Sequence, residues 1–153
     1  MFSHILVAMD GSNAAREALS CAIQEADAHS AALHVVYVVQ TGFWTAGSFP
    51  DSADEADQQA YESAVMTLKR EAESVTSAAV ESAEEAGVTA TASVRFGHPG
   101  EQIITAAQEA GADLLVIGSR GLGAAERFIL GSVSSFVVAH SPISTMVVPF
   151  RDG

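Results

Sequence analysis

Short apolar runs alternate with longer amphipathic stretches along the 153 residues of this chain. The runs HILVAMD at 4–10 and LLVIG at 114–118 are apolar almost throughout, and ALHVVYVV at 32–39 is rich in β-branched residues. Continuous apolar runs of this length are typical of strands buried on both faces of a parallel sheet. Further strands are predicted at 88–96 and at 145–150, where Pro149 restricts the pairing.

Four helices are predicted between these strands. The first runs from Asn13 to about 28, the second from about Ser52 to 86, the third begins near Pro99, and the fourth covers about 132–140. Asp51 or Ser52 is expected to cap the second helix, with Gly87 at the C′ position after its last turn. The apolar positions of this long helix form one stripe, made of Tyr61, Val65, Leu68, Ala72, Val75, Ala79 and Ala83.

The order β-α-β-α-β-α-β-α-β predicts an α/β fold with a five-stranded parallel sheet and helices on both faces. Right-handed crossovers leave few topologies, among which we expect the strand order 3-2-1-4-5. The chain shows no repeat and no low-complexity tail, so 1–153 is read as a single domain. Ligands of such sheets bind beyond the carboxyl ends of the strands.

The region 40–57 interrupts this pattern with glycines, a proline and three aromatic residues, Phe43, Trp44 and Phe49. Such a composition predicts a long loop, which we expect to be mobile. Two interpretations of the aromatic residues stay open. They pack as a small cluster under the loop, or they belong to a lid over a ligand or a patch that docks a partner.

The charge of the chain excludes several kinds of partner. Nineteen acidic residues face seven basic ones, which gives a net charge of −12, and Lys69 is the single lysine. Nucleic acid and anionic membrane surfaces both require clustered lysine and arginine, so neither is expected as a partner. This composition is similar to that of proteins adapted to high salt, which suggests a haloarchaeal type of protein; the simpler interpretation is solubility.

The sequence gives little further information on cellular location, disulfides or metal sites. The N-terminal sequence MFSHILVAMD lacks the basic start of a secretory signal, and no run reaches the length of a membrane span, so we expect a cytoplasmic protein. Cys21 is the single cysteine and excludes an internal disulfide. The five histidines show no spacing typical of metal ligands, and His34 and His140 are expected to be structural.

The most informative segment is GSRGLGAAERFILGS, from Gly118 to Ser132. It follows a buried strand and leads into a helix, so its glycines and the amides of Ser132 and Val133 can form a phosphate site, to which Arg120 adds charge. The alternative is an ordinary loop with turn glycines, in which Ser132 only caps the helix. Spacing alone does not decide between the two. The segment is neither a Walker A loop nor a dinucleotide fingerprint.

GSRGLGAAERFILGSV also matches the G-x2-G-x9-G-[ST] motif of the ATP-binding branch of the universal stress protein family. The rest of the chain resembles the same family through ILVAMDGS, VVYVV, GHPGEQI and ADLLVIGSRG. The resemblance covers essentially all 153 residues. It implies a three-layer, Rossmann-like fold of the adenine nucleotide α-hydrolase type that binds ATP, or ADP or AMP, with Mg²⁺ as a possible companion.

The resemblance also implies a role for individual residues. Asp10 would contact the ribose or the adenine and is the candidate for helping to hold Mg²⁺, although a strand-end Asp is often only a cap. Ala8 and Met9 would lie behind it, and Val38 would hold the adenine through its backbone. Gly118 and Gly121 would face the ribose and phosphates, and the phosphates would be bound by Gly131, Ser132 and Val133. Arg120 stands at a position that varies in the family.

Family members that resemble this chain commonly form dimers through the last strand, so we expect a homodimer through 145–150. We expect a stress-response protein that acts as a nucleotide-dependent sensor or regulator through an unknown protein partner. Two alternatives stay open. One is a slow ATPase, for which no clear general base is seen, and the other is an interaction or chaperone-like module without a ligand.

Overall fold

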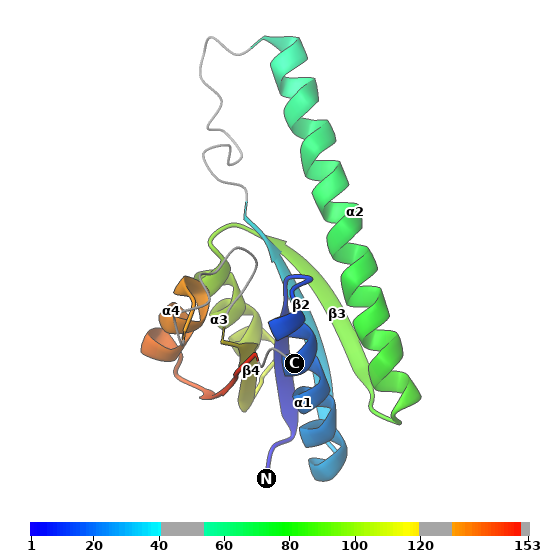
Figure 1. Ribbon diagram of the computed structural model, residues 1–153, viewed down its shortest axis with the longest axis vertical. Coiled ribbons are helices and arrows are strands. Elements are labelled where there is room, and N and C mark those ends of the chain that lie inside the picture. The colour runs from blue at the N-terminus through cyan, green and yellow to red at the C-terminus, as the bar shows by residue number, and fades with distance from the viewer. Residues whose placement is uncertain (41–53, 120–129, 151–153) are drawn as a thin grey trace.

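The computed structural model describes residues 1–40, 54–119 and 130–150 (Figure 1). Strands and helices alternate along these residues as predicted. The five strands are parallel and lie in the order β3-β2-β1-β4-β5, which confirms the predicted topology. The elements are β1 His4–Met9, α1 Asn13–His29, β2 Ala32–Val39, α2 Glu55–Glu85, β3 Ala90–Phe96, α3 Pro99–Glu109, β4 Leu114–Gly118, α4 Ser132–His140 and β5 Ser144–Val148.

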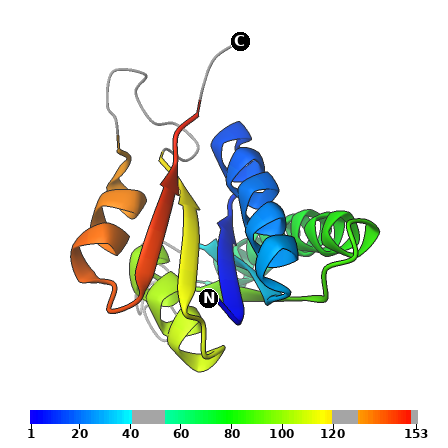
Figure 2. The ribbon, with the colours of Figure 1, turned by 90° about the horizontal axis from the view of Figure 1, so that it is seen from below.

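Two hydrophobic cores hold the three layers together. Helices α1 and α2 cover one face of the sheet, and α3 and α4 cover the other (Figures 1 and 2). The central strand β1 serves both, because Ile5 and Val7 pack on the α1 side while Leu6 packs on the α3 side. Each such fully buried side chain contributes about 1.5–3 kcal/mol to stability. The apolar runs of the sequence are therefore strands buried on both faces.

The helix ends follow local chemistry. Ser12 caps α1, and its Oγ accepts a hydrogen bond from the amide of Ala15 at 3.1 Å. His98 caps α3, and its Nδ1 accepts from the amide of Glu101 at 3.1 Å. After α2 and α3, Gly87 and Gly111 adopt φ angles of 81° and 67°, the left-handed conformation in which glycine avoids a steric penalty.

Helix α2 begins later than predicted. Its cap is Asp54, whose Oδ1 accepts from the amide of Asp57 at 2.8 Å, so the helix starts at Glu55 rather than near Ser52. The positions 55–57 are helical and not part of a loop, because the Asp54 side chain caps the helix and the acidic residues Glu55 and Asp57 in its first turn favour the positive end of the helix dipole. The rest of the predicted loop, 41–53, lies outside the described residues.

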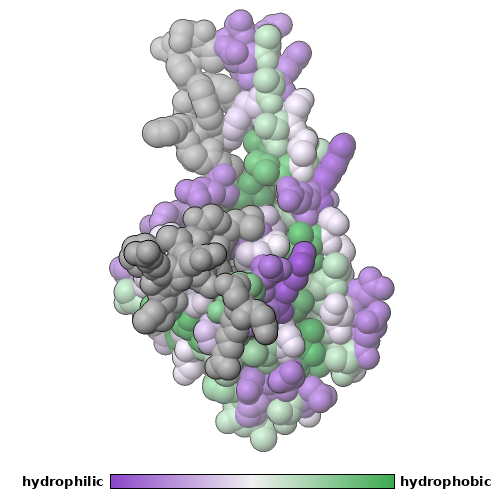
Figure 3. Space-filling view, viewed as in Figure 1, coloured by the Kyte–Doolittle hydropathy of each residue, from purple (hydrophilic) through white to green (hydrophobic). Residues whose placement is uncertain are grey.

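The first half of α2 extends beyond the sheet (Figure 1). Burial begins at Ala72, whereas Met66 and Leu68 are 47% and 42% exposed, so the predicted stripe packs on the sheet only in its second half. The reason is length: 31 helical residues span about 46 Å, while the eight residues of β2 span about 27 Å. Hydrophilic and hydrophobic residues both line the projecting part (Figure 3).

Strand β5 lies at one edge of the sheet and pairs with β4. It runs from Ser144 to Val148, so the predicted strand ends before Pro149. A search of the described residues finds no helix both long and apolar enough to cross a membrane.

Candidate functional site

The carboxyl ends of β1 and β4, which are neighbours in the sheet, form the rim where the predicted ligand residues gather. Asp10 follows β1, and its Oδ1 accepts a hydrogen bond from the amide of Ser12 at 2.8 Å. This bond closes an Asx turn, which leads the chain into α1. Asp10 is therefore a turn residue with one oxygen in use, and its Oδ2 takes no hydrogen bond from the described residues. The α1 cap itself is Ser12.

Tyr37 also lies at this rim, although no motif in the sequence marks it as a site residue. Its hydroxyl donates to the carbonyl oxygen of Asp10 at 3.5 Å, from the neighbouring strand β2. Burial, followed by the negative charges of Glu71 and Asp10, raises the pKa of Tyr37, so the phenol stays protonated and remains a donor. The signal in the sequence was a single tyrosine within the apolar run VVYVV.

Ala8, Met9 and Val38 line the sheet next to this turn. Ala8 and Val38 belong to the core on the α3 side, whereas Met9 is buried on the α1 side. Tyr37 is the partner of Met9 in the register, so Val38 lies one residue further along β2, at the height of Asp10. The side chains of Ala8 and Met9 are thus core residues, and what they can offer a ligand is backbone.

Gly118 has a packing role that the sequence did not reveal. A Cβ atom placed on it would lie 2.9 Å from the backbone C and O atoms of Ala14 and 3.1 Å from the Ala14 Cβ. Real Cβ atoms essentially never approach backbone so closely. Glycine at this position lets the first turn of α1 pack directly on the end of β4, whether or not a ligand is bound.

Ser119 fixes the start of α4 against the end of β4. Its carbonyl oxygen accepts from the amide of Gly131 at 2.6 Å and from the hydroxyl of Ser134 at 2.7 Å. Its own amide donates to the carbonyl of Val148 in β5. Ser119 and Ser134 are both buried. The amide of Gly131, a residue expected from the family resemblance to bind the phosphates, thus already donates a hydrogen bond within the fold.

The first turn of α4 presents the amides that remain. Gly131 is the N-cap, so the alternative in which Ser132 caps the helix is wrong; Ser132 is its first helical residue. The cap has φ −78° and ψ 174°, which any residue can adopt, and it makes no side-chain capping bond. The absence of a capping side chain leaves the amides of Ser132 and Val133 without the acceptor that Ser, Thr or Asp would supply.

Comparison with known proteins then decides the family. The model of the universal stress protein family matches residues 1–149. This chain belongs to the universal stress protein family. A universal stress protein of Thermus aquaticus is 36% identical over 97% of this chain and 99% of its own length.

Solved structures of universal stress proteins share the fold. UspA from Lactobacillus plantarum superposes with a TM-score of 0.83 over 95% of this chain and 97% of its own, at 24% identity. A universal stress protein in complex with cAMP gives a TM-score of 0.65 at 25% identity, over 97% of both chains. The observed sheet order and layers are those of this family's Rossmann-like fold.

Several residues predicted for this universal stress protein lie outside the described residues. Arg120 and Gly121, between β4 and α4, are among them, as are Phe43, Trp44 and Phe49 before α2. The described part of the chain thus brings together the turn of Asp10, the end of β2, Gly118 and the start of α4. Within that same part, no group of three or more His, Cys, Asp or Glu side chains is arranged to hold a metal ion.

Proposed function

We propose that this universal stress protein binds an adenine nucleotide, with ATP as the first candidate, at the carboxyl rim of β1 and β4. The observation that carries the proposal is the N-terminus of α4, which starts directly beyond this rim on a glycine cap without a capping side chain. The amides of Ser132 and Val133 and the positive end of the helix dipole suit phosphate oxygens. The Ser132 side chain is exposed and adds a hydroxyl.

The other end of the nucleotide would lie along β1 and β2. Asp10 Oδ2 is available to accept from a ribose hydroxyl, and the backbone near Val38 offers contacts to the adenine edge. Tyr37, held against the Asp10 carbonyl, would fix the turn that carries this carboxylate. In the glycine segment, Gly121 would face the ribose and phosphates, and Arg120 would add a positive charge for the phosphates. The cAMP complex of a relative supports adenine nucleotides as the class and makes cAMP a competitor to test.

The regulatory part of the proposal concerns what the nucleotide changes. A ligand that binds one conformation more tightly shifts the population toward it, and thus alters the affinity for a protein partner. We propose that the chain works as a cytoplasmic sensor of this kind, as a homodimer paired through β5 and the residues up to 150. Mg²⁺ would accompany ATP.

Calorimetric titration tests the proposal. Purified protein at high salt is titrated with ATP, ADP, AMP and cAMP, with and without Mg²⁺, and micromolar binding of ATP is expected. Ser132→Ala removes a hydroxyl and is expected to weaken binding about fivefold to tenfold, the effect of roughly 1–1.5 kcal/mol for one hydrogen bond. The matched control is Ser135→Ala, in the same helix and also exposed, which is expected to leave binding unchanged. Absence of binding by every nucleotide contradicts the proposal.

A further inference from the structure

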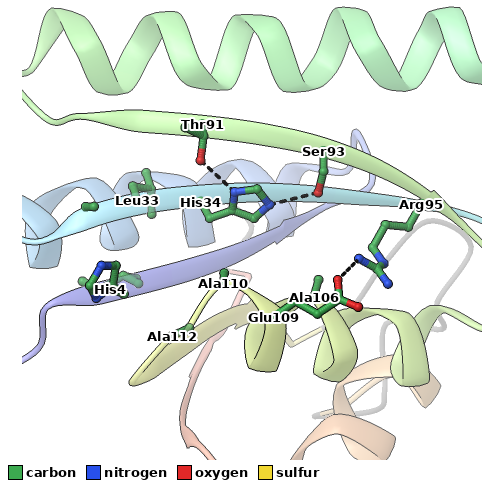
Figure 4. Close-up of a pocket in the computed structure, with 12 residues that line it drawn as sticks. His4, Leu33, His34, Thr91, Ser93, Arg95, Ala106, Glu109, Ala110 and Ala112 are labelled. Carbon is green, nitrogen blue, oxygen red and sulfur yellow. Dashed lines mark hydrogen bonds and ion pairs between the residues drawn. The ribbon is translucent and has the colours of Figure 1, made fainter.

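A groove with one polar wall lies on the sheet face opposite α2, between helix α3 and strands β2 and β3 (Figure 4). Its volume is about 380 Å³, within the range of about 300–1,000 Å³ found for small-molecule sites. His4 and Ala32, the first residues of β1 and β2, line it, so it reaches the amino ends of these strands rather than the carboxyl rim. None of its lining residues belongs to the proposed nucleotide site.

The polar side chains on the strand wall of this groove are unusual for a parallel sheet, whose faces are normally apolar. On β3, the alternate residues Thr91, Ser93 and Arg95 point to the groove and are polar. On β2, His34 occupies the face that further along carries Val36 and Val38 of the core. The opposite wall, from α3 and the turn after it, offers small side chains. This geometry leaves space beside the edge strand.

His34 forms the centre of a hydrogen-bonded chain. Its Nδ1 lies 2.8 Å from Thr91 Oγ1, and its Nε2 lies 2.9 Å from Ser93 Oγ. In a neutral imidazole one nitrogen donates and the other accepts. One hydroxyl therefore accepts from the ring and keeps its own proton to donate, while the other donates to the ring and keeps lone pairs to accept. Whichever tautomer is present, the two ends of the chain together offer one donor and one acceptor.

Neutrality of the imidazole is favoured by its surroundings. Burial, and then the positive charge of Arg95, lowers the pKa of His34. Across the groove, Arg95 donates from Nε to Gln102 Oε1 at 2.9 Å and pairs from a terminal nitrogen with Glu109 at 2.7 Å (Figure 4). The guanidinium of Arg95 is thus matched by the carboxylate of Glu109.

The wall opposite the strands supplies apolar contacts. Ala106, Ala110 and Ala112 lie opposite the polar strand residues and present methyl groups (Figure 4). None of the lining residues is Phe, Tyr or Trp, so there is no stacking surface for a large aromatic ring. A fitting ligand is compact, has one C–H face for the alanines, and carries hydroxyl groups that each donate and accept.

We propose that this groove is a binding site for a small uncharged polyhydroxy molecule, a sugar or polyol of about monosaccharide size. Paired hydroxyls of such a molecule match the donor and acceptor ends of the Thr91–His34–Ser93 chain. The Arg95–Glu109 pair at one end offers additional donors and acceptors to a neighbouring hydroxyl. The site is separate from the nucleotide site and does not depend on it.

Ring resonances of His34 provide the readout. Carbon–proton correlation spectra are recorded at pH 8 and constant high salt during titrations with glucose, myo-inositol, sodium acetate and sodium phosphate. At least one of the two polyols is expected to give a saturable shift in the millimolar range, whereas the anions give none. Thr91→Val keeps the shape of the side chain and the strand preference but removes one hydroxyl, and it is expected to weaken binding at least tenfold.

Thr89→Val is the matched control, because Thr89 is an exposed threonine just before β3 that does not line the groove, and it is expected to bind as the wild type does. Ser93→Ala tests the other end of the chain and is expected to weaken binding as Thr91→Val does. The proposal is overturned if neither polyol gives a saturable shift, if an anion binds more tightly than both polyols, or if Thr91→Val and Thr89→Val respond alike.

Discussion

Glycine serves two different purposes in the segment from Gly118 to Gly131. At Gly118 the missing Cβ makes room for Ala14 of α1, which is a requirement of the fold. At Gly131 the backbone angles suit any residue, so what glycine provides is an uncapped helix start. A variant at Gly118 that fails to bind nucleotide would therefore say little about the ligand, whereas a change at the start of α4 addresses the ligand directly.

Gly118→Ala is expected to destabilise the protein without any ligand present. The new methyl group would lie 2.9 Å from the Ala14 backbone, which cannot move without displacing α1. Overpacking of this kind costs about 1–3 kcal/mol. Urea unfolding at fixed salt measures the loss, with Gly131→Ala as the control that should change stability by less than 1 kcal/mol. Equal stability of Gly118→Ala and wild type would contradict the packing role.

His34 is expected to make stability depend on pH. Its pKa is below the usual value of 6.5 in the folded chain, so the unfolded chain takes up a proton more readily. The contribution of neutral His34 to the free energy of unfolding is fully present above about pH 6.5 and is lost as the pH falls through the lowered pKa of the folded chain. Arg95 from β3 opposes protonation, while Glu109 from α3 and His4 from β1 also line this groove.

Unfolding of wild type and His34→Gln at pH 7.5 and pH 5.5 measures this contribution. The wild type is expected to lose more stability between the two pH values than the variant does, since glutamine cannot titrate. Equal losses in the two proteins would show that His34 titrates alike in the folded and unfolded chains.

At the scale of elements, periodicity predicted what packs on the sheet and could not predict what lies beyond it. The run HILVAM and the start of the first helix at Asn13 are determined by local sequence, and both lie where the pattern predicted them. In α2 the stripe from Tyr61 to Ala83 is uniform in sequence, yet only the part from Ala72 meets the sheet. A helix pattern contains no information on the length of the strands beneath it.

Only part of the site could be predicted from the sequence, because only some of its features depend on local sequence. The start of α4 and the turn at Asp10 were visible as motifs, because glycine, serine and aspartate at strand ends have local signatures. The hydrogen bonds of Ser119 to the start of α4, and the hydrogen bond from Tyr37 to the Asp10 carbonyl, join residues far apart in sequence. The Thr91–His34–Ser93 chain needs the register of β2 against β3, and no local pattern reveals it.

At the scale of the whole molecule, the edge strand β5 and the high negative charge act in opposite directions. An edge strand leaves backbone groups open to pairing with another chain, and partly buried Met146 and Val147 add apolar surface. Copies that each carry a charge of −12 repel one another, and salt screens this repulsion. The proposed homodimer is therefore expected to be stronger at high salt.

Light scattering after size exclusion tests the dimer at micromolar concentration. The wild type is expected at twice the 15.8 kDa chain mass in molar salt and to dissociate in part in dilute buffer. Met146→Glu places a charge on the pairing strand and is expected to give monomers. Met66→Glu, on the projecting part of α2, is the control and stays dimeric. A wild type that is monomeric in molar salt would contradict pairing through β5.

The proposed nucleotide binding depends on the amides at the start of α4, which would hold the phosphates of an adenine nucleotide. Amide correlation spectra recorded during titration with ATP and Mg²⁺ test it residue by residue. Large, saturable downfield shifts are expected for the amides of Ser132 and Val133, whereas the amide resonance of Glu101 in the first turn of α3, which is already bonded to His98, is expected not to shift. Saturable ATP binding that leaves Ser132 and Val133 unshifted, or no binding at all, would contradict it.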